Sequence, residues 1–225
     1  MRRLRFRYAR LGVFCLVKLW VRKIHHRENL PAQGPVIIVS NHTSYLDWVI
    51  LSALYPEKYI VFIGAQELKS RPLVSWLVKV HHVIFIDRKN PGSSFFKEAL
   101  WRLKNNHILV VYPEGKRSPS GKMLEPKSGF INLAIALNVP VVPIGMKGTY
   151  EILPPGNAIP RLRRCEVIVG EKFRIAPDSP SFGDIFRDEK DPGKISETAV
   201  KKIALRIMEK IRTMTGQEWE EHVPE

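Results

Sequence analysis

The sequence has few cysteines and no long hydrophobic run, and each scarcity excludes a class of protein. Its 225 residues include two cysteines, Cys15 and Cys165, which lie far apart. This excludes a disulfide scaffold and favours a reducing compartment. The uncharged run Leu11–Val17 is far shorter than the about 20 apolar residues of a membrane-spanning helix, and no small-residue signal cleavage site follows it. A hydrophobic share of 44% nevertheless indicates a globular chain rather than a disordered one.

Several motifs of common enzyme classes are also missing. The chain has no Gly-x-Ser-x-Gly elbow, no dinucleotide-binding glycine fingerprint and no Cys/His spacing typical of a metal site. Lys116 lacks the upstream glycine of a Walker loop and is followed by Arg117. We therefore expect no resident metal or cofactor.

Positive charge is abundant and unevenly distributed. The formal net charge of +14 predicts an anionic partner, which could be nucleic acid, an acidic membrane surface or a phosphorylated substrate. The first 27 residues hold nine Lys and Arg and no acid. Residues 3–25 are predicted to form one basic amphipathic helix lying in a membrane interface, or else packed on the domain with its basic face in solvent. The rest lacks the basic and aromatic interleaving of a nucleic-acid binder.

Short apolar runs alternate with helical patterns from about residue 35, which predicts an α/β domain with a mostly parallel central sheet flanked by helices. We expect a single domain over 28–214, preceded by the basic helix (1–27) and followed by an acidic tail (215–225). The expected strands are 36–40, 59–63, 83–86, 108–112, 139–146 and 165–169. The expected helices are 45–54, 70–79, 93–105, 128–137 and 196–214, with a loop over 176–195.

The clearest candidate site follows the first of these buried strands. His42 and Asp47 are five residues apart, so they can meet only if His42 lies in the turn before a helix. Ser44 and Asp47 have a capping-box spacing that supports such a turn. Asp47 could then orient the His42 ring and leave the opposite nitrogen free as a general base. The alternative is that Asp47 is only a capping carboxylate.

Two further strand ends carry candidate ligand-binding residues. One strand continues into Pro113-Glu-Gly-Lys-Arg-Ser118, where Gly115 allows close backbone approach, and Lys116 and Arg117 suit a phosphate. Another ends in Arg88. The alternative for the Pro113–Ser118 segment is a basic surface turn.

In this order, the motifs resemble those of the glycerolipid acyltransferases, especially the 1-acylglycerol-3-phosphate acyltransferases. They are Asn-His-x4-Asp at 41–47, Arg88, Pro-Glu-Gly-x-Arg-Ser at 113–118, and Val-Pro-Val-Val-Pro-Ile at 139–144. The resemblance implies that His42 is the base, that Asp47 orients it, and that the acceptor headgroup is bound by Arg88, Glu114, Gly115 and Arg117. Lys116 stands where the family usually has Thr, so it adds a positive charge beside that site.

The resemblance also implies the reaction: an acyl group passes from acyl-CoA or acyl-carrier protein to a lysophospholipid hydroxyl. The cations Arg88, Lys116 and Arg117 favour lysophosphatidic acid as the acceptor, because its phosphate monoester carries about two negative charges. From the basic helix we expect the protein at the cytoplasmic face of an anionic membrane. Three alternatives stay open. One is a sister acyltransferase for another lysolipid, one is a hydrolase, and one is a non-enzymatic basic membrane binder. Arg88, Lys116 and Arg117 could also bind the phosphates of CoA rather than the acceptor.

Overall fold

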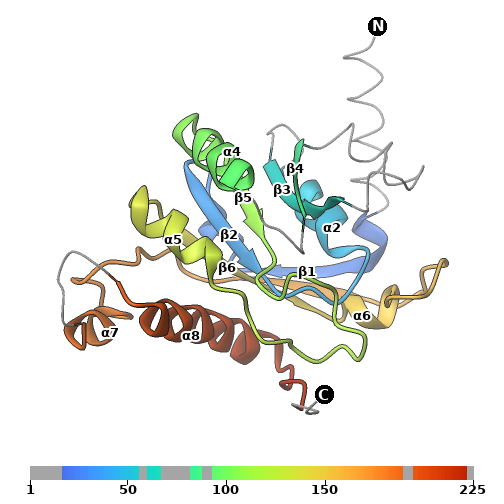
Figure 1. The fold of residues 1–225 in the computed structure, drawn as a ribbon. Coiled ribbons are helices and arrows are strands. Elements are labelled where there is room, and N and C mark those ends of the chain that lie inside the picture. The colour runs from blue at the N-terminus through green and yellow to red at the C-terminus, as the bar shows by residue number, and fades with distance from the viewer. Residues whose placement is uncertain (1–16, 56–59, 67–81, 88–92, 190–194, 222–225) are drawn as a thin grey trace, which may run out of the picture.

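The computed structural model describes residues 17–55, 60–66, 82–87, 93–189 and 195–221. Its centre is a seven-stranded sheet in the order β1-β7-β6-β2-β5-β3-β4, in which all neighbours are parallel except β6 and β7. Helices flank the sheet (Figure 1), so the predicted single α/β domain with a mostly parallel sheet is confirmed. The strands are β1 (Val21–His25), β2 (Val36–Ser40), β3 (Ile60–Ala65), β4 (His82–Ile86), β5 (Ile108–Val111), β6 (Val141–Lys147) and β7 (Cys165–Val169).

The helices are η1 (Arg27–Asn29), α2 (Asp47–Leu54), α4 (Ser93–Lys104), α5 (Gly129–Ala136), α6 (Thr149–Ile152), α7 (Gly183–Arg187) and α8 (Glu197–Thr215). Except for three short ones, η1, α6 and α7, the described helices follow the predicted pattern. α7 corrects the predicted loop over 176–195. Five residues are too few to show a helical period in the sequence. A contact with a distant helix stabilises α7, since its Asp184 pairs with Arg206 on α8. The helix expected over 70–79 lies outside the described residues.

Alternate residues of the strands build two separate cores, because successive side chains of a strand point to opposite faces. Ile37 and Val39 of β2 lie in the core that α4, α5, α7 and α8 cover. Ile38 lies in the opposite core, beneath α2 and α6. Burial of the central strands on both faces accounts for their continuous Val and Ile runs.

The predicted N-terminal helix is wrong at its C-terminal end. Residues 17–20 are helical, but Val21–His25 form strand β1, which pairs in parallel with β7. The local pattern of Val21 and Ile24 permits either a helix or a strand. Hydrogen bonding to β7 favours the strand. The sheet therefore begins before the predicted boundary at residue 28, and residues 1–16 lie outside the described part.

The predicted acidic tail is in part a structural segment. Helix α8 continues to Thr215, and Trp219 then forms a parallel β-bridge with Met123. The Met123 N–H donates to the Glu218 carbonyl at 2.8 Å, and the Glu220 N–H donates to the Met123 carbonyl at 2.8 Å. The tail thus braces the loop that follows β5. Among the described residues, no helix is both long enough and apolar enough to cross a membrane.

Candidate active site

Two sequence-distant motifs meet because they follow neighbouring parallel strands. β2 pairs with β5, with Val39 opposite Val111, so both strands end at one edge of the sheet. His42 comes shortly after β2, and Glu114 comes shortly after β5. The Ser118 N–H donates to the His42 carbonyl at 2.9 Å and joins the two loops directly. Crevices at such strand ends are where α/β sheets bind ligands.

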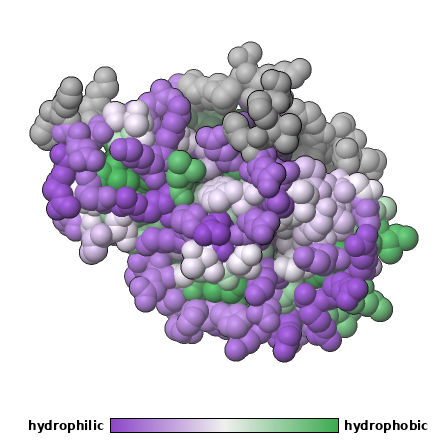
Figure 2. All heavy atoms as spheres, turned by 90° about the horizontal axis from the view of Figure 1, so that it is seen from below, coloured by the Kyte–Doolittle hydropathy of each residue, from purple (hydrophilic) through white to green (hydrophobic). Residues whose placement is uncertain are grey.

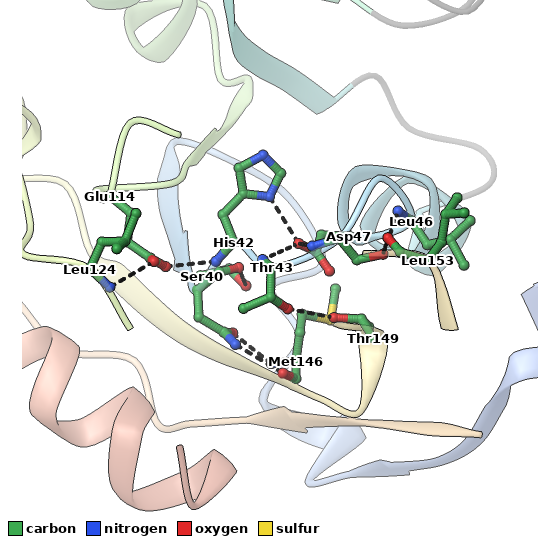
Figure 3. Close-up of polar contacts among 12 residues, drawn as sticks. Ser40, His42, Thr43, Leu46, Asp47, Glu114, Leu124, Met146, Thr149 and Leu153 are labelled. Carbon is green, nitrogen blue, oxygen red and sulfur yellow. Dashed lines mark hydrogen bonds and ion pairs between the residues drawn. The ribbon is translucent and has the colours of Figure 1, made fainter. Parts of the chain in front are cut away.

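The turn between β2 and α2 is organised around one carboxylate oxygen. Asp47 Oδ2 accepts hydrogen bonds from the backbone N–H groups of Thr43 and Ser44, each at 2.8 Å. The same oxygen lies 2.8 Å from His42 Nδ1 (Figure 3). Asp47 is fully buried, whereas the His42 side chain keeps 17% of its surface exposed. The carboxylate therefore fixes both the turn and the imidazole.

The capping-box prediction is right for Asp47 and wrong for Ser44. The Asp47 carboxylate accepts from the Ser44 N–H, as the box requires, but α2 itself begins at Asp47. Ser44 Oγ accepts from the Leu46 N–H at 3.1 Å and donates to the Leu153 carbonyl at 2.8 Å. Ser44 thus ties the turn to the end of α6, a contact that no local pattern could indicate.

This geometry indicates which ring nitrogen of His42 carries the proton. Asp47 Oδ2 accepts two backbone N–H groups and acts as an acceptor toward His42 Nδ1, so Nδ1 carries the proton. Nε2 then has a free lone pair, and in Figure 3 that side of the ring points away from the labelled hydrogen-bond partners. A histidine oriented by a buried carboxylate with its other nitrogen unprotonated is the arrangement of a general base.

Tyr112, which follows β5, completes the packing of the imidazole. Its ring stacks on the ring of His42 with centroids 4.1 Å apart and an interplanar angle of 19°. Burial, together with the nearby charge of Asp47, raises the pKa of the Tyr112 hydroxyl well above its usual value. Tyr112 therefore stays neutral and restricts the His42 ring to one plane.

Glu114 lies beside the backbone of His42 (Figure 3). Its two carboxylate oxygens accept from the backbone N–H groups of His42 (2.7 Å) and Leu124 (3.0 Å). Its side chain is buried, and burial raises the pKa of its carboxyl to about 8 against the lowering effect of those two donors. This geometry makes Glu114 a positioning residue for the backbone of His42, and its predicted headgroup contact stays a prediction.

Arg117 lies against Tyr45, in the turn between β2 and α2 that carries His42. Its guanidinium carbon is 3.7 Å from the centroid of the Tyr45 ring, a cation–π arrangement. Gly115 adopts a φ of +70°, in the left-handed region that favours glycine, and a Cβ there would meet the Lys127 side chain at 3.2 Å. Lys116 is exposed on the same loop. Arg88 lies outside the described residues, so its predicted headgroup contact stays a prediction.

Comparison with known proteins decides the family. A sequence model described as acyltransferase matches residues 21–147, more than half of the chain. The chain belongs to the acyltransferase family. It is 36% identical over 173 residues to the human 1-acyl-sn-glycerol-3-phosphate acyltransferase alpha, covering 74% of this chain and 56% of that protein. It is 32% identical over 164 residues to a chloroplastic 1-acyl-sn-glycerol-3-phosphate acyltransferase of Brassica napus, covering 67% and 47%.

A solved structure supports the fold of this acyltransferase. The 1-acyl-sn-glycerophosphate (LPA) acyltransferase of Thermotoga maritima superposes with a TM-score of 0.65 at 24% identity, covering 96% of this chain and 82% of that one. The chain spans about half the length of the first curated relatives that it matches. The part that the family model matches, residues 21–147, includes His42 and Asp47.

Besides Tyr112, two residues that support the site, Asn41 and Gln217, were missed as site residues from sequence. Asn41 is fully buried, and its amide accepts from the Met146 N–H (2.8 Å) and donates to the Met146 carbonyl (2.9 Å), which locks β2 to β6. The same amide donates to Gln217 Oε1 at 2.6 Å, and Gln217 Nε2 donates to the Gly121 carbonyl at 2.7 Å. The position of Asn41 before His42 was a usable signal, whereas nothing in the sequence indicated Gln217.

Burial of Glu114 predicts a pH-dependent stability. The carboxyl holds its proton up to about pH 8 in the folded protein but releases it near 4.5 when unfolded. The folded state thus binds more protons between these values, and stability falls as pH rises, by at most about 1.4 kcal/mol per pH unit. Urea unfolding from pH 5 to 8 should show this decline in the wild type and a shallower one in Glu114→Gln.

The matched control for this experiment is Glu125→Gln, on the same loop, where the carboxylate is exposed. Its unfolding free energy should follow the wild-type pH curve. Parallel curves for the wild type and Glu114→Gln would contradict the assignment of the slope to Glu114.

Proposed function

We propose that this acyltransferase transfers a fatty acyl group from acyl-CoA or acyl-carrier protein to the free hydroxyl of 1-acylglycerol-3-phosphate, giving phosphatidic acid. The observation that carries the proposal is the His42–Asp47 pair at 2.8 Å, with Asp47 fully buried. The curated relatives are named as 1-acyl-sn-glycerol-3-phosphate acyltransferases, which supports this acceptor. The choice of donor rests on the sequence resemblance alone.

The reaction needs one base and one aligned pair of substrates. Nε2 of His42 takes the proton of the acceptor hydroxyl as the oxygen attacks the thioester carbonyl. The tetrahedral intermediate then collapses, the carbon–sulfur bond breaks, and the leaving thiolate takes the proton from His42. Asp47 stabilises the transient imidazolium, and holding both substrates in one cleft supplies much of the acceleration.

Arg117 is the residue that we assign to the acceptor phosphate. In 1-acylglycerol-3-phosphate the phosphate is attached to the carbon next to the one that bears the free hydroxyl, so its partner must lie close to His42. Arg117 meets this requirement because it lies over Tyr45, and because the following residue, Ser118, donates to the His42 carbonyl. A guanidinium can bind a phosphate monoester through two parallel hydrogen bonds.

The site of action that we propose is the cytoplasmic face of a membrane, with the protein bound peripherally or monotopically. The reasons are the nine basic residues and the absence of acids in the first 27 residues, together with the lipid nature of the acceptor. Of that segment, residues 17–27 are described; residues 17–20 are helical and Val21–His25 form β1.

Steady-state kinetics with purified full-length protein tests the function and the role of Arg117 together. The wild type should acylate lysophosphatidic acid far better than lysophosphatidylcholine or lysophosphatidylethanolamine, because only the first offers a phosphate monoester. Arg117→Ala should raise the acceptor KM roughly 10- to 100-fold, as expected for a lost charge-assisted bond of about 1.5–3 kcal/mol. The donor KM should change little.

Lys116→Ala is the neighbouring control, since it removes an exposed positive charge from the same loop. It should raise the acceptor KM less than Arg117→Ala does. A donor-only KM defect in Arg117→Ala would assign this cation to the donor phosphates instead. A wild type that prefers a diester lysolipid would overturn the proposed acceptor.

A further inference from the structure

The loop between α6 and β7 exposes an unusual amount of hydrophobic surface. Ile159 is 80% exposed and Leu162 is 96% exposed, although single exposed hydrophobic residues are ordinary in folded proteins. Here the two lie three positions apart and are interleaved with three exposed arginines, Arg161, Arg163 and Arg164. Residues 152–165 contain no acid. The loop therefore combines apolar side chains with a concentrated positive charge.

Hydrogen bonds hold this loop in place. The Arg161 N–H donates to the carbonyl of the buried Ile152 at 2.8 Å, which closes the base of the loop. The Asn157 N–H donates to the Pro154 carbonyl at 3.3 Å, and the Arg163 N–H donates to the Arg161 carbonyl at 2.9 Å. The backbone thus presents Ile159 and Leu162 to solvent from a closed loop, as in compact functional surface loops.

A second segment extends the same surface. β1 pairs in parallel with β7, with Val21 opposite Cys165, so the residues before the two strands are neighbours. The Cys165 thiol donates to the Trp20 carbonyl at 3.5 Å, and Leu19 is 57% exposed. We call this surface the basic apolar edge: Lys18, Leu19, Ile159, Arg161, Leu162, Arg163 and Arg164. In Figure 1 the loop before β7 extends to the right. In Figure 2, which keeps the same right-hand side, hydrophobic atoms project there.

We propose that the basic apolar edge docks on an anionic lipid bilayer. Ile159 and Leu162 would enter the boundary between headgroups and acyl chains, and the arginines would bind lipid phosphates through their planar forks. A bilayer fits these side chains better than a protein partner, because they project singly instead of lining a groove that could enclose a partner. The charge is also complementary to anionic headgroups.

The loop lies next to the turn that carries His42, so docking would bring the membrane close to the active site; this step rests on the proposed function. The loop starts directly after Leu153, whose carbonyl accepts from Ser44 Oγ (2.8 Å) and from the Tyr45 N–H (3.3 Å). Ser44 and Tyr45 belong to the turn that carries His42. Docking of the basic apolar edge therefore brings the bilayer that holds the lipid acceptor next to the catalytic turn.

A fluorescent label at the loop tests whether it enters the bilayer. The full chain with Cys15→Ser and Leu162→Cys is labelled with an environment-sensitive dye; the remaining Cys165 is 1% exposed. Vesicles of equal parts phosphatidylcholine and phosphatidylglycerol should shift the dye emission to the blue and raise its intensity. The control label, at Leu205→Cys on α8, should not shift. Unshifted emission at position 162 while the protein sediments with the vesicles overturns the proposal and points to a different partner for the edge.

Vesicle sedimentation tests the contribution of the edge to binding. The Ile159→Asp/Leu162→Asp variant should bind the same vesicles at least about tenfold more weakly than the wild type. Leu205→Asp, a change of the same chemistry at a residue that is 43% exposed, should bind normally. Equal binding by the two variants overturns the proposal. The vesicles contain neither acceptor nor donor, so a failure of the proposed reaction leaves this result unaffected.

Discussion

Replacing His42 with alanine should lower kcat about 10²–10⁴-fold, the usual contribution of a general base. The expected loss is confined to chemistry, because the backbone of His42 keeps its hydrogen bonds to Glu114 and Ser118 whatever the side chain. The free energy of unfolding should change by no more than about 1–2 kcal/mol. Steady-state assays and denaturant unfolding on the same preparation measure both quantities.

The control for His42→Ala is another histidine substitution that leaves the site intact. His26 has a 65% exposed side chain and a φ of 54°, so His26→Asn is suitable because asparagine tolerates the left-handed region. This variant should retain wild-type turnover. Near-normal turnover in His42→Ala would show that another group removes the proton, and the proposed mechanism would be wrong.

Two substitutions of Asp47 should separate its structural role from its chemical one. Asp47→Ala leaves the Thr43 and Ser44 N–H groups buried without an acceptor, at about 1–3 kcal/mol each, and removes the partner of His42. We expect it to lose about 2–5 kcal/mol of unfolding free energy and most of its turnover. Asp47→Asn keeps an oxygen for the backbone groups and should be far more stable.

Asp47→Asn should still be slow, by about 10²–10⁴-fold in kcat, because the amide oxygen can accept from Nδ1–H but lacks the negative charge that stabilises the imidazolium. Chemical unfolding of both variants gives their stabilities, and kcat gives their activities. Equal activity of Asp47→Asn and the wild type would reduce Asp47 to a capping residue, the alternative that the sequence left open.

The sequence alone determined the elements whose signals are local. Buried strands such as Val36–Ser40 have runs of Val and Ile, and α8 has a clear helical period ending in Gly216, whose φ of 72° suits a helix end. The spacing of His42 and Asp47 also predicted their contact on the condition that His42 lies in the turn before the helix, and the structure meets that condition. These are short-range constraints that few neighbouring residues set.

Tertiary structure alone decided the features that depend on distant partners. β1 is a strand because β7 offers it an edge, and nothing within residues 21–25 required that choice. Glu114 became a support for the catalytic backbone because β2 and β5 are adjacent in the sheet. Gln217 reaches Asn41 across 176 positions of sequence, because the end of α8 packs beside β6. Pairing, burial and hydrogen bonding across such separations are properties of the folded chain, so no local pattern encodes them.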